Sequence, residues 1–265
     1  MIALLAARAG QPTPGRAAHL VERNLLHYRR NWIIIVSGFF EPLFYLLGIG
    51  FGVGGFVGTI TQGGQHFRYA VFVAPALMAT SVMNGAIAET AFNFFGKLKY
   101  MHLYDAVLAT PLGPGDVALG EVIWALTRGS LYAAAFLVIM AALGLVTSLW
   151  AVLALPAAIL IGFAFSATGT AVATFVRTWQ DFDLVLTVLL PLFLFSGTFY
   201  PIALYPGWAQ FLIQLTPLYH GVDLLRSLTT GVFGPWLIVD VAYLLALAGV
   251  ALTIASLRIR RLLLT

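Results

Sequence analysis

Several ionisable residues lie inside apolar stretches of this sequence, where a charge requires a partner. Glu41 precedes Pro42 in the first apolar stretch, and Glu121 and Arg128 lie seven residues apart in the third. An ionised side chain near the centre of a membrane helix costs roughly 2.5 to 3.5 kcal/mol, so each should have a hydrogen-bonding partner or face water. The seven-residue spacing places Glu121 and Arg128 on one helix face, where they can join a polar network between helices.

Glu41 has two interpretations that the residues leave open. It lines a substrate path or locks a contact between helices, or it makes a buried structural hydrogen bond. Glu89, at the inner end of the second apolar stretch, is better explained by a structural role. The aromatic residues that we assign with Glu41 to a substrate path or helix lock are Phe44 and Tyr45.

The sequence motifs of several common catalytic sites are absent. There is no Gly-x-x-x-x-Gly-Lys-Ser/Thr phosphate loop, no His-Glu-x-x-His and no Gly-x-Ser-x-Gly, and the five histidines lack ligand spacing. The absence of cysteine excludes a disulfide frame, a thiolate zinc site and an iron–sulfur cluster. We expect no catalytic residue, metal or cofactor in this chain, so ATP hydrolysis would require another subunit.

Residues 93–116 contain a short helical pattern between two apolar stretches. Tyr100, Tyr104 and Val107 follow i, i+4, i+7 spacing, and Pro111 ends the pattern. Such a short helix is marginal alone, so we expect it to dock onto a partner. The alternative is a solvated loop followed by Asp116 as a helix cap. The other residues assigned to this contact are Lys97, Met101 and Asp105, together with Trp179 and Asp181 from the segment 177–183.

Composition indicates that lipid is the main solvent of this protein. Of the 265 residues, 61% are apolar and only 9% are charged, which is too little polar surface for a water-soluble globule. We predict an all-α membrane protein with six transmembrane helices. The expected spans are 31–53, 69–92, 117–143, 149–175, 184–200 and 236–257.

Two further elements flank or interrupt these spans. We expect residues 1–30 to form a lead-in and a helix lying in the membrane interface, followed by the six-helix domain at 31–265; the alternative for residues 16–30 is an ordinary juxtamembrane basic stretch. The apolar segment that ends at Pro217 is too short to cross, so we expect an outer re-entrant hairpin between spans five and six.

The distribution of basic residues predicts the orientation. Eleven of the 14 Lys and Arg residues lie on one side if both termini are cytoplasmic. Their positions at the ends of apolar runs are typical of topology signals, and they do not form the basic stripe of a nucleic-acid-binding protein.

Several motifs together resemble the permease subunit of type-2 ABC exporters. They are Glu41–Leu47, Leu108–Pro111 leading to Leu119–Glu121, Phe195–Pro201, and Pro217–Arg226. That family includes NodJ-like lipo-oligosaccharide exporters, daunorubicin-type drug exporters and O-antigen polysaccharide permeases. The last two motifs resemble its outer re-entrant segment, in the order and spacing of Ser196, Gly197, Phe199, Pro201, Pro217, His220, Asp223 and Arg226.

The resemblance implies a homodimer, or a pair with a paralogous permease, in the plasma (inner) membrane. Residues 97–110 would be a coupling helix, and Thr178–Asp183 a second contact, for a separate ATP-binding subunit that uses ATP and Mg²⁺. The implied function is ATP-driven export of an amphiphile such as a glycolipid, a lipo-oligosaccharide or a hydrophobic drug. The alternatives are a membrane-embedded lipid-modifying enzyme using Glu41 or Asp105 as base, and an ion-coupled secondary transporter.

Overall fold

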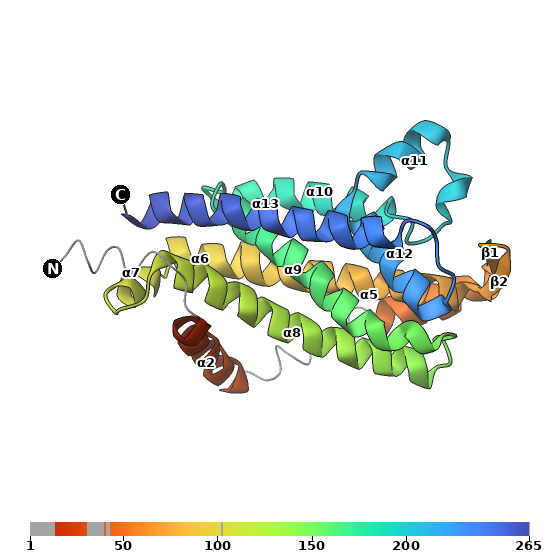
Figure 1. The fold of residues 1–265 in the computed structure, drawn as a ribbon, viewed down its shortest axis with the longest axis horizontal. Helices are drawn as coiled ribbons and strands as arrows, with labels where there is room; N and C mark the ends of the chain where they lie inside the picture. Colours follow the sequence, from red (N-terminus) through yellow and green to blue (C-terminus); the bar gives the residue numbers. More distant parts are fainter. Residues whose placement is uncertain (1–13, 31–39, 41–42, 102, 265) are drawn as a thin grey trace.

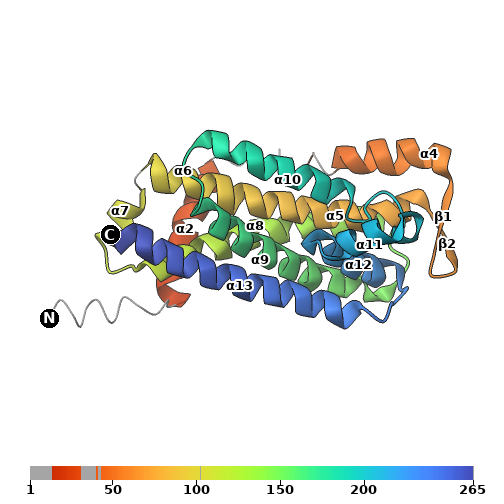
Figure 2. The ribbon, with the colours of Figure 1, turned by 90° about the horizontal axis from the view of Figure 1, so that it is seen from above.

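Four of the expected spans are present as long apolar helices. The computed structural model describes residues 14–30, 40, 43–101 and 103–264. Within those ranges, four helical stretches are long and apolar enough to cross a membrane: Tyr69–Lys99, Gly115–Ala142, Leu149–Ala173 and Leu237–Ile259. They run side by side along the long axis of the molecule (Figures 1 and 2).

These stretches combine several helical elements. The first comprises α5 (Tyr69–Ile87), the π-helical η2 (Ala88–Asn93) and α6 (Phe94–Lys99). The others are formed by α8 (Pro114–Ala142), by η3 (Leu149–Leu153) with α9 (Ala154–Ala173), and by α13 (Leu237–Leu264).

The expected first and fifth spans are only partly matched. Residues 31–39 and 41–42, with Glu41, lie outside the described ranges, and the helical part that follows includes η1 (Leu46–Val53) and α4 (Gly54–Val57). The fifth is α10 (Phe182–Leu194), which has 13 residues. At 1.5 Å per residue it is about 20 Å long, shorter than a hydrocarbon core of about 30 Å. Six spans therefore remain a prediction.

Helix α5 lies at the centre of the bundle and is buried on all sides along most of its length. It packs against α8, α9 and α12 (Pro217–Thr230), which explains why most of its surface, rather than one stripe, is apolar. Helix α9 approaches η2 closely at Gly169, where a Cβ atom would collide with Thr90 Oγ1. A glycine at this position lets the two backbones meet.

One short β-hairpin interrupts the otherwise helical chain. Strands β1 (Thr59–Gln62) and β2 (Gln65–Arg68) pair antiparallel, with Gln62 opposite Gln65. Both turn residues, Gly63 and Gly64, have positive φ angles of 58° and 79°. A two-residue turn with positive φ at both positions matches the strand twist, and glycine adopts it without strain. The rest of the described chain is helical, so this small hairpin is an addition to an all-α fold.

Helix α2 (Pro14–Arg30) confirms the helix expected near the start of the chain. It crosses α8 obliquely near the end of the bundle that also holds α6, α7 (Leu103–Leu108) and the C-terminus (Figure 1). Leu20 and Asn24 are buried, whereas Leu25 and Leu26 are exposed. This amphipathic pattern fits an interfacial helix, and its depth in a membrane remains a prediction.

The chain between α10 and α13 forms short helices at the opposite end of the bundle from α7 (Figure 1). They are η5 (Ile202–Leu204), α11 (Gly207–Gln214) and α12. Helix α11 exposes Trp208 and Phe211, whereas α12 is mostly buried. A buried α12 suits backbone that enters a membrane under protein cover, and the re-entrant placement remains a prediction.

Candidate functional site

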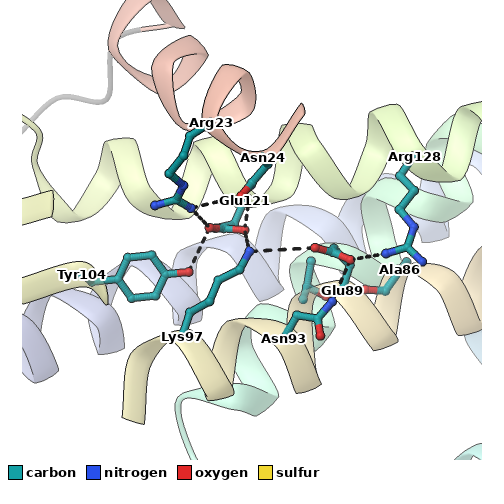
Figure 3. Close-up of polar contacts among 10 residues, drawn as sticks. Arg23, Asn24, Ala86, Glu89, Asn93, Lys97, Tyr104, Glu121 and Arg128 are labelled. Atoms are coloured by element: carbon teal, nitrogen blue, oxygen red, sulfur yellow. Dashed lines mark hydrogen bonds and ion pairs between the residues drawn. The ribbon is translucent and has the colours of Figure 1, made fainter. Parts of the chain in front are cut away.

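A cluster of polar side chains around two buried carboxylates lies where α2 crosses α8, and we call it the charge cluster (Figure 3). It draws on five helical elements: α2, and the four that follow one another along the chain from η2 to α8. Its members are Arg23 and Asn24 of α2, Glu89 and Asn93 of η2, Lys97 of α6, Tyr104 of α7, and Glu121, Arg128 and Tyr132 of α8.

The Glu121 carboxylate is the centre of the cluster and is only 1% exposed. Lys97 Nζ donates to Oε2 at 2.7 Å and the Tyr104 hydroxyl donates to Oε1 at 3.0 Å. From α2, Arg23 donates at 3.2 Å and Asn24 at 3.4 Å. A buried carboxylate requires such partners, because losing one ionic partner typically costs several kcal/mol. Glu121 thus joins α2, α6 and α7 to α8.

Glu89 is the second buried carboxylate. Arg128 Nη1 lies 2.6 Å from its Oε2, Asn93 donates to the same oxygen at 2.9 Å, and Lys97 Nζ lies 3.9 Å from Oε1. Arg128 also donates through Nε to the Tyr132 hydroxyl at 3.1 Å. Lys97 therefore links the surroundings of the two carboxylates.

The expected network around Glu121 and Arg128 exists, but the two residues bind different partners. Glu121 binds Lys97 and Arg23, and Arg128 binds Glu89. The residues at 89, 93 and 97 share one face because they follow a four-residue spacing. That spacing could have identified Glu89, Asn93 and Lys97 as members of one cluster.

The protonation state of Tyr104 fixes the direction of its hydrogen bond. Burial, and next the charge of Glu121, raise the pKa of the Tyr104 phenol well above its usual range. The phenol therefore keeps its proton and donates to the carboxylate near neutral pH. Nothing in this cluster resembles a metal site: among the described residues no three His, Asp or Glu side chains are placed to hold a metal ion.

The segment expected to be one coupling helix at 97–110 forms two short helices. Helix α6 ends when Tyr100 and Met101 both donate backbone N–H bonds to Gly96, and α7 starts at Leu103. Tyr100 is 58% exposed, whereas Tyr104 is 1% exposed and points into the bundle. The expected common face of Tyr100, Tyr104 and Val107 is therefore not formed. The side chain of Asp105 and all of His102 lie outside the described part of the chain.

An aromatic surface joins the two segments expected to contact a partner. The ring of Trp179 stacks on Tyr100 at a centroid distance of 5.8 Å, and Phe95 packs against both rings at 5.3 and 5.9 Å. Trp179 is 45% exposed and Met101 is 72% exposed. We call Tyr100, Met101 and Trp179 the aromatic surface. It lies at the α6 end of the bundle.

Asp181 holds the turn that carries Trp179. Its Oδ2 accepts the backbone N–H groups of Arg177 and Thr178 at 2.8 and 3.1 Å, and its Oδ1 accepts the Thr178 hydroxyl at 3.0 Å. These bonds cap the 3₁₀ turn η4 (Trp179–Asp181) and lower the pKa of the Asp181 carboxyl group. Asp181 acts here as a cap that positions Trp179.

A cavity of about 580 Å³ lies between the first helical segment, α5, α8 and α10. Tyr45 and Arg128, both assigned to a substrate path, line it, whereas Phe44 is exposed elsewhere on its helix. The polar wall that α5 contributes was not predicted from the sequence. The lining residues are Tyr45, Leu77, Thr80, Ser81, Asn84, Gly85, Ile87, Ala88, Phe92, Arg128, Tyr132, Leu186, Leu189, Leu190 and Phe193.

The segment expected on the outer side of the membrane, residues 195–226, which we call the outer segment, is held by a buried arginine. Arg226 donates to the carbonyl oxygens of Phe72 at 3.1 Å and Gly197 at 2.8 Å, and its guanidinium lies 3.8 Å from the centre of the Phe72 ring. Gly197 has φ of 72°, which aims its carbonyl at Arg226 without strain. Next to it, Ser196 and Thr198 share a hydrogen bond of 2.8 Å.

The remaining residues of the outer segment also have structural contacts. His220 bridges Asp240, at 2.7 Å from Nδ1, and the Gln214 carbonyl, at 2.8 Å from Nε2. Phe199 packs on Phe193 at a centroid distance of 5.1 Å, and Pro217 opens α12, where a missing N–H is tolerated. Pro201 precedes η5, and Asp223 is half-buried on α12.

Comparison with known proteins gives a consistent family assignment. Residues 17–229 match the family described as ABC-2 type transporter. The chain is 35% identical over 213 residues to nodulation protein J of Rhizobium leguminosarum bv. trifolii, covering 77% of this chain and 80% of that protein. It is 27% identical over 208 residues to the inner membrane transport permease YadH of Escherichia coli K12, covering 76% and 77% of the two chains.

Proposed function

Because this chain belongs to the ABC-2 type transporter family of membrane permeases, we propose that it is the permease subunit of an ATP-driven exporter of an amphiphilic substrate. ATP and Mg²⁺ would be used by a separate ATP-binding subunit, since the sequence has no phosphate loop of its own. The force of ATP hydrolysis then has to enter through a protein contact.

The observation that carries this proposal is the direct connection between an exposed surface and the buried charge cluster. Tyr100 and Met101 of the aromatic surface follow α6 directly, and α6 carries Lys97, which binds Glu121 at 2.7 Å. Tyr104, just beyond, binds the same carboxylate. A partner that pushes on Tyr100 and Trp179 would displace the segment 97–104, which carries two hydrogen-bonding partners of Glu121. This displacement would move α8 and α2.

The proposed assembly places two copies of the chain in the plasma (inner) membrane with both termini in the cytoplasm. Support comes from the eleven basic residues that this orientation places inside. The six spans and the outer re-entrant hairpin belong to the same proposal. Accessibility tags test it: a tag next to Tyr100 should be reached only from the cytoplasm, and one at Gly64 only from outside.

The contact with the ATP-binding subunit is tested by removing the two exposed rings. We expect Tyr100→Ala/Trp179→Ala to reduce co-purification of the ATP-binding subunit by about tenfold or more, because an aromatic hot spot at an interface contributes about 2 kcal/mol or more. The matched control is Tyr200→Ala/Trp208→Ala, which removes two exposed rings at the opposite end. Equal capture by both double variants would contradict the proposal. Substrate transport driven by an ion gradient without any ATPase would favour a secondary transporter.

A further inference from the structure

The cavity between α5, α8 and α10 has the size of a small-molecule site. Its volume of about 580 Å³ lies within the range of roughly 300 to 1,000 Å³ typical of pockets for drug-sized ligands. It can hold one compact molecule or the head and first carbons of a longer one, and it is too small to enclose a polymer. Its two walls differ in chemistry.

The α5 wall offers uncharged hydrogen-bonding groups. Within the described part of the chain, the Ser81 hydroxyl and the Asn84 amide have no hydrogen-bond partner, and both side chains are half-buried at the cavity. The Tyr132 hydroxyl accepts a bond from Arg128, which leaves its own proton to donate. A half-buried amide without a partner is best satisfied by a ligand or water that fills the cavity.

Among the described residues, Arg128 is the only charged side chain that lines the cavity, and its pairing favours a neutral ligand. Arg128 is already bound to the buried Glu89 carboxylate at 2.6 Å. An anionic head group at Arg128 would compete with Glu89 and leave a buried carboxylate short of a partner, which is costly. A cationic head group would be repelled by the guanidinium. A neutral head with hydroxyl or amide groups avoids both costs.

The α10 wall is apolar, with Leu186, Leu189, Leu190 and Phe193 facing the cavity. We infer that the cavity binds the uncharged, hydroxyl- or amide-bearing head of an amphiphile through Ser81 and Asn84, with the adjoining hydrocarbon against α10. This inference rests on the proposed transport function and names the class of its substrate. It makes Asn84 a specificity-determining residue.

Binding is measured on the full chain in phosphatidylcholine nanodiscs with three photoreactive dodecyl probes that differ only in their heads. The heads are N-methylglucamide, phosphate and trimethylammonium. We expect saturable labelling of α10 by the glucamide probe, with an apparent affinity at least tenfold higher than for either charged probe. Asn84→Leu, which keeps the branched shape but removes the amide, should weaken glucamide labelling by about tenfold. Leu189→Trp, which fills the cavity, should abolish it.

The matched control is Thr187→Val on the exposed face of α10, outside the cavity lining, which should leave the affinity unchanged. Preferred labelling by dodecyl phosphate or by trimethylammonium would overturn the inference, as would unchanged labelling in both Asn84→Leu and Leu189→Trp. The binding assay needs no ATPase, so a failure to capture an ATP-binding subunit defeats only the proposed function. Conversely, ATP-driven transport that is unaffected in both cavity variants would defeat only the cavity site.

Discussion

The Tyr104 hydroxyl donates to Glu121 Oε1 at 3.0 Å, joining α7 to the middle of the charge cluster. Tyr104 follows the exposed Tyr100 by one helical turn in sequence, yet its ring is buried against Phe94 at a centroid distance of 5.2 Å. Tyr100 is thus placed to receive a contact, and Tyr104 to transmit its displacement. The two tyrosines should have separable phenotypes.

We predict that Tyr104→Phe keeps capture of the ATP-binding subunit but reduces substrate-stimulated ATPase activity. The substitution retains the ring packing and removes only the hydrogen bond to a charged acceptor, worth about 1.5 to 3 kcal/mol. Co-purification and ATPase rates with and without substrate provide the measurement. Tyr100→Ala is the comparison, because it should weaken capture. The assigned roles would be contradicted if Tyr104→Phe lost capture while stimulation in the remaining complex stayed normal.

A second prediction concerns the ion pair of Lys97 and Glu121. Glu121→Gln should lower the free energy of unfolding by about 3 kcal/mol, because it leaves two partly buried cations, Lys97 and Arg23, without their nearest counter-ion. Lys97→Met should cost less in the Glu121→Gln background than in the unmodified chain, by more than 1 kcal/mol. Reversible unfolding in mixed micelles measures all four corners of this cycle.

The control for this cycle is Lys99→Met. Lys99 is the last residue of α6, and its side chain is exposed. The substitution should cost less than about 0.5 kcal/mol in either background. Additive effects of Glu121→Gln and Lys97→Met would show that the two side chains contribute little coupling energy despite their close contact.

The sequence predicted the long helices well because their length and apolar composition are local properties. It also predicted that Glu121 and Arg128 join a polar network, since charges inside apolar helices need partners. The direction of Tyr104 was not predictable in this way. Residues at i, i+4 and i+7 share a face only within one continuous helix. Because α6 ends at Lys99 and α7 starts at Leu103, Tyr100 and Tyr104 do not belong to the same helix. The β1–β2 hairpin was missed because its strands have only four residues each.

The cavity was missed for a different reason. Ser81 and Asn84 are individually unremarkable polar residues in a long apolar helix, and their meaning comes from α8 and α10, which lie far away in sequence. Only the packed structure brings their side chains opposite Leu189 and Arg128. Distant contacts of this kind leave little signal in a single sequence.

A third prediction concerns Asp181. Hydrogen bonds from the backbone N–H groups of Arg177 and Thr178 lower the pKa of its carboxyl group. A carboxyl group with a lower pKa in the folded state contributes stability above its unfolded pKa of about 4, and this contribution is lost as the pH falls through the folded value. The η4 turn should therefore stay intact from neutral pH to about pH 5 and loosen only in stronger acid.

Acrylamide quenching of Trp179 reports this change in a variant whose other tryptophans are Phe. Quenching should rise below about pH 4, and Asp181→Asn should raise it at neutral pH, because an amide lacks the charge that favours the cap. A rise that begins near neutral pH, or an unchanged signal in Asp181→Asn, would exclude Asp181 as the residue that positions Trp179.

The last prediction tests the close approach of α9 to η2, the element that carries Glu89. In Gly169→Ala the new methyl group would collide with Thr90 Oγ1 and lie 3.4 Å from the Ala91 nitrogen. Overpacking of this kind costs typically 1 to 3 kcal/mol, so we expect a loss of about 2 kcal/mol in the free energy of unfolding. Thr90→Ala in the same chain should restore at least half of it. Gly249→Ala is the control, since nothing lies within 4 Å of its added methyl group, and it should be neutral or stabilise by about 1 kcal/mol.

The same substitution should affect activity. Thr90 and Glu89 both belong to η2, so a methyl group that displaces Thr90 should also weaken the Arg128–Glu89 pair and lower substrate-stimulated ATPase activity in Gly169→Ala. Wild-type stability together with wild-type ATPase activity in Gly169→Ala would mean that the two helices can separate without disturbing the charge cluster.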